Sequence, residues 1–190
     1  MNSKPLPEIA VIIPLYNEES VLRTFHQQLV GVIDTLPNRT RIYYVDDGSV
    51  DETSNLLTDL QKEDERVQVL TLSRNFGHQA ALTCGLDHAI GDIVITIDGD
   101  GQNPPELIPE MLNLHTAGYE IVIAQRQEDD ALPWFKRLSS HLFYRVINTV
   151  GNLNITPNAA DFRLLSRQVV EALKAMPEYH RFLRGMVSWV

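Results

Sequence analysis

Short runs of apolar residues alternate with longer amphipathic stretches along the first 125 residues of the chain. The apolar runs are typical of strands that are buried on both faces, and they cover residues 9–13, 41–45, 67–72, 93–97 and 119–124. Between these runs apolar residues recur at helical spacing, as Leu22, Phe25 and Leu29 do after the first one. Strands that alternate with helices in this way predict an α/β fold, with a mainly parallel sheet flanked by helices on both faces.

The remaining third of the chain has a different pattern of apolar and polar residues. A polar break at residues 127–131 precedes an amphipathic helix predicted over residues 134–150. Residues 161–165 predict a short strand, and Ser166 is a suitable cap for a helix that follows it. We interpret residues 1–190 as a single domain, because this length suits one sizeable hydrophobic core.

Three helix starts are also predicted from local chemistry. Asn17 can cap the helix after the first strand, and Ser49 with Glu52 forms a capping box for the helix after the second. His78 is interpreted as a residue at the start of a helix rather than as a ligand.

Composition and charge narrow the possible functions. A content of 44% hydrophobic and 22% charged residues is ordinary for a soluble globular protein. The net charge of −9 argues against a nucleic-acid partner. Cys84 is the single cysteine, so no disulfide can form within the chain, which fits a reducing cytoplasm. No stretch reaches the roughly 18 apolar residues that a membrane-spanning helix needs.

Two carboxylates one residue apart follow the fourth predicted strand, at Asp98 and Asp100. With the carbonyl of Gln102 they offer oxygen ligands to Mg²⁺ or Mn²⁺ at the end of a strand, where open α/β sheets bind ligands. An EF-hand is excluded, because its sixth and twelfth positions would hold Asn103 and Pro109. A plain turn rich in Asp and Gly remains the alternative.

Other acidic residues follow the first two predicted strands. They are Glu18, preceded by Asn17, and the pair Asp46 and Asp47. Since parallel strands end at the same edge of a sheet, these residues are expected to converge with the carboxylates at 98 and 100. The glycine-rich fingerprints of dehydrogenases and P-loop NTPases are missing, so neither class is favoured.

Five motifs occur in one order along the chain. They are Pro14-x-Tyr16-Asn17-Glu18, Asp46-Asp47-Gly48-Ser49-x-Asp51, Arg74-Asn75-x-Gly77, Asp98-x-Asp100-x-Gln102-x-Pro104-Pro105 and Asp161-Phe162-Arg163-Leu164. From about residue 9 onwards, the chain resembles the family 2 glycosyltransferases, which have the GT-A fold. It is most similar to their polyprenyl-phosphate branch, which includes dolichol-phosphate mannose synthases and bactoprenol glucosyltransferases.

The resemblance implies a role for each matching residue. A nucleotide-sugar pocket is expected from Pro14, Tyr16, Asn17, Glu18, Asp46, Asp47, Gly77, Asp98 and Gly99. The metal ligands are expected to be Asp98, Asp100 and Gln102. Arg126 and Arg137, with Ser140, are expected to face the acceptor phosphate, although Lys136 is an alternative to Arg137. Asp161 lies where relatives that act on a sugar hydroxyl place a base.

The sequence departs from this family at two glycines. Many relatives have Ala between the two carboxylates and Leu after the second, where this chain has Gly99 and Gly101. We expect the glycines to loosen the loop without removing the metal ligands.

The function implied is the inverting transfer of a hexose to a polyprenyl (undecaprenyl) phosphate on the cytoplasmic face of the inner membrane. UDP-glucose is the favoured donor and GDP-mannose a possible one, while the oligomeric state is left open. Relatives usually continue into interface and membrane helices, so we expect the chain to be truncated before them and to be soluble as it stands.

Two other functions stay open. One is a GT-A transferase that acts on a sugar hydroxyl in cell-surface polysaccharide synthesis, and the other is a nucleotide-sugar-binding module without turnover. Structural roles are also open for Arg163, as an ion-pair partner of Asp161, and for Arg181 and Arg184, as an exposed helix face.

Overall fold

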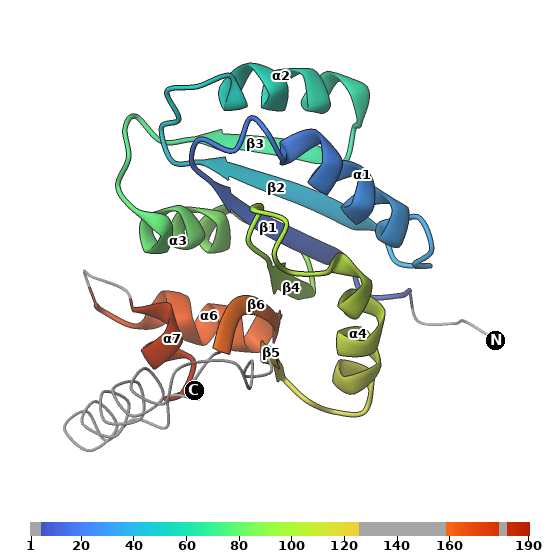
Figure 1. The fold of residues 1–190 in the computed structure, drawn as a ribbon. Coiled ribbons are helices and arrows are strands. Elements are labelled where there is room, and N and C mark those ends of the chain that lie inside the picture. Colours follow the sequence, from blue (N-terminus) through green and yellow to red (C-terminus); the bar gives the residue numbers. More distant parts are fainter. Residues whose placement is uncertain (1–4, 126–158, 179–181) are drawn as a thin grey trace, which may run out of the picture.

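Six strands form one sheet in the computed structural model, which describes residues 5–125, 159–178 and 182–190 (Figure 1). The strands are β1 (Ile9–Leu15), β2 (Thr40–Asp46), β3 (Val67–Thr71), β4 (Ile93–Thr96), β5 (Ile121–Gln125) and β6 (Ala159–Ser166). Their order across the sheet is β3-β2-β1-β4-β6-β5. The helix predicted over residues 134–150 lies outside the described residues.

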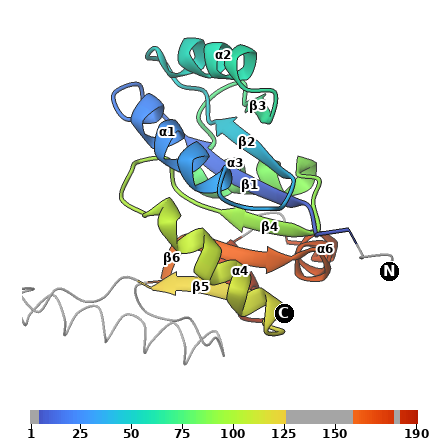
Figure 2. The same ribbon diagram turned by 90° about the vertical axis from the view of Figure 1, so that its right-hand side faces the viewer.

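The predicted mainly parallel sheet is confirmed, with one reversed strand. β1 pairs in parallel with β2 and β4, and β2 pairs in parallel with β3. β6 is antiparallel to both of its neighbours, β4 and β5. Figure 2 shows β4, β6 and β5 side by side beyond β1. The short strand predicted over residues 161–165 is therefore inserted between two strands that precede it in the chain.

Helices cover both faces of the sheet. They are α1 (Leu22–Ile33), α2 (Thr53–Glu63), α3 (His78–His88), the 3₁₀ helix η1 (Pro105–Leu107), α4 (Ile108–Thr116), α6 (Arg167–Ala175) and α7 (Leu183–Met186). One core packs α1, α2 and α4 against Ile9, Val11 and Ile13, while the other packs α3, α6 and α7 against Ala10 and Ile12. Successive strand residues face opposite sides, so two cores explain why β1 is apolar throughout. None of the described helices is long and apolar enough to cross a membrane.

Two predicted helix caps are wrong. α1 begins after Val21 and α2 after Glu52, and neither has a side-chain cap. Instead, the amide N–H of Asn17 donates to Ser49 Oγ at 2.9 Å, and Asn17 Oδ1 accepts from the amide of Val50 at 2.9 Å. These groups pair because β1 and β2 are parallel neighbours whose loops leave the sheet at the same edge. The cap predicted at Ser166 is confirmed, since its Oγ accepts from the amide of Val169 at 3.3 Å.

A buried histidine on α1 makes stability depend on pH. The Nδ1 of His26 shares a 2.9 Å hydrogen bond with the hydroxyl of Tyr44, and the His26 residue is only 8% exposed. Burial disfavours the charged imidazolium, so the pKa of His26 lies below its usual value of 6.5. The unfolded chain thus binds more protons than the folded one between the two pKa values, and stability falls as pH drops below about 6.5.

Replacing His26 by Gln is expected to flatten this dependence. Gln keeps a polar partner for the buried Tyr44 hydroxyl but does not titrate. As pH drops below about 6.5, the free energy of unfolding should fall faster in the wild type than in His26→Gln. The difference between the two slopes should reach up to about 1.4 kcal/mol per pH unit. Urea unfolding at several pH values measures the slope. His115→Gln, at a partly exposed histidine of α4, is the control, and an unchanged slope in His26→Gln would contradict the assignment.

Candidate active site

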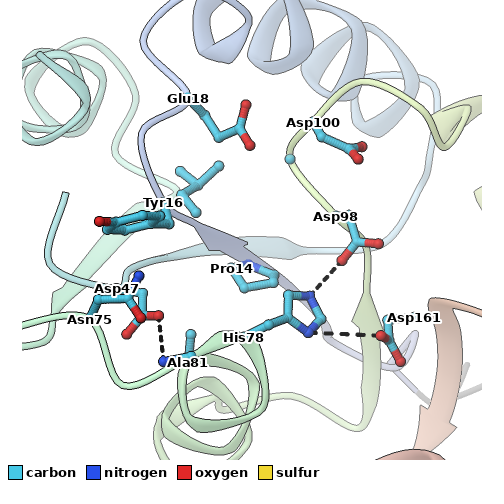
Figure 3. A pocket seen from close by; sticks show the side chains of 13 residues that line it. Pro14, Tyr16, Glu18, Asp47, Asn75, His78, Ala81, Asp98, Asp100 and Asp161 are labelled. Atoms are coloured by element: carbon cyan, nitrogen blue, oxygen red, sulfur yellow. Dashed lines mark hydrogen bonds and ion pairs between the residues drawn. The ribbon is translucent and has the colours of Figure 1, made fainter. Parts of the chain in front are cut away.

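A cavity of about 470 Å³ lies where the loops after β1, β2, β3 and β4 meet β6. Most of the residues predicted for the site line it: Pro14, Tyr16, Glu18, Asp47, Gly77, Asp98, Gly99, Asp100 and Asp161. The other lining residues are Leu15, Asn75, His78 and Ala81 (Figure 3). Its size is within the range typical of small-molecule sites, about 300–1,000 Å³. The predicted convergence of acidic side chains at this edge of the sheet is therefore present.

Three predicted residues lie elsewhere. Asn17 has a φ of 56° and joins the loops after β1 and β2. Asp46 is fully buried and accepts from the amide of Ser49 at 2.9 Å and from the hydroxyl of Ser54. Gln102 is exposed and does not line the cavity. Asn17 and Asp46 thus make structural contacts within the loops. The side chain of Gln102 does not lie with the other predicted metal ligands, Asp98 and Asp100.

The two carboxylates after β4 have protein donors around them. Asp98 Oδ1 lies 2.8 Å from His78 Nε2, and its Oδ2 lies 3.4 Å from Asn103 Nδ2. Asp100 Oδ1 accepts from the amide of Gln102 at 2.9 Å. The loop thus places both carboxylates at the cavity through its own backbone and through α3.

The donor set fits Mg²⁺ or Mn²⁺. Within residues 5–125, 159–178 and 182–190, no three His, Cys, Asp or Glu side chains close around a possible ion. Two carboxylates with further positions open suit Mg²⁺, which is usually held by one or two carboxylates together with substrate phosphates and water. The pKa of Glu18 is raised, mainly by burial and then by the charges of Asp100 and Asp51. A cation at this edge would offset that repulsion.

Asp47 shapes one wall of the cavity. It is nearly buried, and its carboxylate accepts from the amides of Phe76 and Gly77, each at 2.8 Å. Gly77 has a φ of 95°, which turns the chain into α3. The residues predicted for the nucleotide pocket therefore include one that also holds the loop after β3.

Asp161 and Arg163 form a buried ion pair on β6. Arg163 Nη2 lies 2.8 Å from Asp161 Oδ1, and both side chains are about 5% exposed. The structural interpretation of Arg163 is confirmed. The hydroxyl of Thr96 donates to the carbonyl of Asp161 at 2.6 Å, which ties β6 to the end of β4. Asp161 is thereby fixed beside the carboxylates that follow β4.

Gly99 is closely packed rather than loose. A Cβ at this position would overlap Leu15 Cδ2 and lie 2.9 Å from Ile13 Cγ2. The expected loosening is therefore wrong at Gly99, because β1 passes too close for a side chain. Gly101 differs, since it has a φ of 75° and nothing near its Cβ position.

His78, Asn75, Leu15 and Ala81 line the cavity although sequence reasoning did not select them. His78 does begin α3, as predicted, but it also contacts Asp98. The order of the strands could have indicated them, because the helix that joins β3 to β4 must cross β2 and β1 and so begins at the edge of the sheet where the cavity lies. Arg126 and Arg137, predicted for the acceptor, lie outside the described residues together with Lys136, Ser140 and Arg181, and nothing is described for the side chain of Arg184.

Comparison with known proteins gives a consistent result. The model of the family described as "Glycosyl transferase family 2" matches residues 10–174. An uncharacterized glycosyltransferase of Synechocystis sp. is 41% identical over 96% of this chain and 58% of its own length. The bactoprenol glucosyl transferase of Shigella phage SfV is 38% identical over 96% of this chain and 60% of its own. The chain thus spans about three fifths of the length of these curated relatives.

Solved structures show the same fold. A mannosyltransferase from Pyrobaculum calidifontis, PcManGT, in complex with GDP-Man and Mn²⁺, has a TM-score of 0.62 at 19% identity. The similarity covers 90% of this chain and 48% of that one. The fold is therefore the GT-A fold of glycosyltransferases. From the family match and the identity to its relatives, this chain belongs to glycosyl transferase family 2.

Proposed function

We propose that this chain transfers a hexose from a nucleotide sugar to a polyprenyl phosphate, and that Asp98 and Asp100 bind a divalent cation for this reaction. The observation that carries the proposal is that these two carboxylates share one cavity with Pro14, Tyr16 and Asp47, which the family resemblance assigns to the nucleotide. The name of the SfV relative supports glucose as the sugar and bactoprenol as the lipid. With a lipid acceptor of this kind the proposed reaction takes place at the membrane, on the cytoplasmic face that the family resemblance implies.

The chemistry is a single displacement that inverts the anomeric carbon. An oxygen of the acceptor phosphate forms the new bond to C1 while the bond from C1 to the nucleoside diphosphate breaks. When bound, Mg²⁺ or Mn²⁺ at Asp98 and Asp100 supplies neutralisation of the negative charge on the leaving diphosphate. A phosphate monoester has a second pKa near 6, so at pH 7 this nucleophile needs no strong base. Asp161, paired with Arg163, orients a cation or a sugar hydroxyl in this proposal and does not abstract a proton.

Calorimetric binding tests this proposal. UDP, UDP-glucose, GDP and GDP-mannose are titrated into the chain with Mn²⁺ and, separately, with EDTA. We expect UDP-glucose and UDP to bind with Mn²⁺ and to lose at least about tenfold in affinity in EDTA, because a cation held by Asp98 and Asp100 would attract the negatively charged diphosphate. Selective binding of GDP-mannose would change the donor. Equal binding with and without the metal, or no binding of any nucleotide, would overturn the proposal.

A transferase that acts on a sugar hydroxyl is the second candidate, and the place of Asp161 in the cavity favours it. A hydroxyl needs a base, which typically contributes about 10²–10⁴-fold to the rate. We expect the wild-type chain to glycosylate undecaprenyl phosphate in vesicles, and Asp161→Asn to lower its kcat by less than about tenfold, because a phosphate nucleophile needs no base.

The buried ion pair complicates this variant, so it needs a control. Asp161→Asn alone leaves the Arg163 charge in the interior, and such a loss typically costs about 3–5 kcal/mol of stability. The double variant Asp161→Asn/Arg163→Met removes both charges. A fall of kcat by more than about a hundredfold in the folded double variant would favour the hydroxyl acceptor.

A further inference from the structure

His78 lies between two carboxylates of the cavity, those of Asp98 and Asp161. Its Nε2 is 2.8 Å from Asp98 Oδ1, and its Nδ1 is 3.8 Å from Asp161 Oδ2. Figure 3 shows the imidazole ring between these side chains, which come from the end of β4 and from β6. The ring therefore links α3 to both strands at the site.

The direction of the shorter contact follows from the chemistry of the groups. An ionised carboxylate only accepts hydrogen bonds, so Nε2 of His78 donates its N–H to Asp98. The second oxygen of Asp98 lies 3.4 Å from the side-chain amide of Asn103, which is a longer contact. The contact with His78 is thus shorter than the one with Asn103, and it restricts rotation of the Asp98 carboxylate.

The position of His78 is itself fixed by the nucleotide side of the cavity. The Asp47 carboxylate binds the amides of the two residues just before His78, and the left-handed Gly77 then starts α3. On its other side the ring faces Asp161, which is paired with the buried Arg163. A continuous set of contacts therefore runs from Asp47 through His78 to Asp98.

We propose that His78 is a positioning residue, whose Nε2–H holds Asp98 in the orientation that receives the divalent cation. The inference rests on the proposed function, because it takes Asp98 as a metal ligand. Partners that hydrogen-bond to ligating groups typically change metal affinity or activity by about 10–100-fold when they are removed. A residue of this kind acts through Asp98 and needs no contact with the sugar.

Three substitutions at one position separate this role from a general structural one. His78→Gln keeps an amide N–H at about the reach of Nε2, whereas the amide of His78→Asn is one methylene shorter and ends near the place of Nδ1. His78→Ala has no donor. His88→Gln, at the other end of α3 and away from the cavity, is the matched control.

The measurement is Mn²⁺ affinity in the presence of saturating UDP or GDP, from the electron paramagnetic resonance signal of free Mn²⁺. We expect the dissociation constant for Mn²⁺ to rise about 10–100-fold in His78→Ala and His78→Asn. His78→Gln should stay within about threefold of the wild type, because its donor reaches Asp98. The thermal midpoint and the affinity for nucleotide in EDTA should not change in any of the variants.

The outcomes distinguish the two proposals. If the wild type binds Mn²⁺ and His78→Ala binds it equally well, the positioning role is overturned and the proposed function stands. Equal weakening in the Gln, Asn and Ala variants would also overturn it, since a structural role of the ring would then suffice. If the wild-type chain binds no Mn²⁺ with either nucleotide, the proposed function fails, and the inference fails with it.

Discussion

Replacing Asp98 by Ala is expected to abolish glycosyl transfer. Asp98 and Asp100 line the cavity and are the carboxylates proposed to hold a divalent cation, and charge neutralisation on a leaving diphosphate is worth several kcal/mol. The loss of kcat should reach about a thousandfold or more, which corresponds to about 4 kcal/mol. Transfer from UDP-glucose to undecaprenyl phosphate in vesicles measures the rate, and calorimetry measures the Mn²⁺-dependent binding of UDP, which should disappear as well.

Two controls accompany this variant. Asp59→Ala removes an exposed carboxylate on α2, outside the cavity, and should leave both readouts unchanged. Asp98→Asn keeps the shape of the side chain but loses its charge, so it should lose metal-dependent binding while the chain still unfolds at the wild-type temperature. Normal transfer by folded Asp98→Ala would refute the metal site.

Gly48→Ala is expected to cause the largest loss of stability among simple glycine substitutions. Gly48 has a φ of 69°, and a Cβ there would lie 2.5 Å from the carbonyl carbon of Arg74 and 2.8 Å from the amide nitrogen of Asn75. Both atoms are backbone and have little room to move. Strain and overlap together should cost about 3 kcal/mol or more, or a fall of about 6–12 °C in the melting temperature. Nucleotide binding should weaken too, because residues 75 and 77 line the cavity.

Two other glycines separate the causes. Gly118→Ala introduces the strain alone, since its φ is 107° and nothing lies within 4 Å of its Cβ position, and it should cost about 1–2 kcal/mol. Gly31→Ala, in α1 with open space and an ordinary φ, should gain about 0.5–1 kcal/mol. A Gly48→Ala variant no less stable than Gly118→Ala would show that the close approach of the loop after β3 is not a constraint.

The elements of the fold could be read from the sequence because each has its own local cause. The apolar run of β1 is buried on both faces, and the pattern in α1 follows the side that packs on the sheet. Helix ends were harder. Asn17 and Ser49 have the chemistry of helix caps, but a parallel neighbour strand brought their loops together, and they bond to each other. Local propensity cannot report a competing partner that is 32 residues away.

The pair Asp46 and Asp47 shows the same limit within the site. Both residues stand at the end of β2 and carry the same group, and the sequence could assign both to the nucleotide. Asp46 is the last residue of β2 and Asp47 is the first residue after it, and their side chains point in different directions. The Asp46 carboxylate turns into the loop and is fully buried, while that of Asp47 reaches the cavity. Which of the two lines the site depends on how the helices cover each face.

The sequence by itself determined the alternation of strands and helices and the acidic residues that follow the strands, because chain order places a motif directly after its own strand. Only the tertiary structure decided which motifs meet. β6 pairs with β4 in reverse and so brings Asp161 beside Asp98, 63 positions earlier in the chain. α3 packs against β1 and β2 as the chain passes from β3 to β4, and so carries His78 to the same carboxylate. Both contacts arise from the pairing order of the strands, which is a property of the whole sheet.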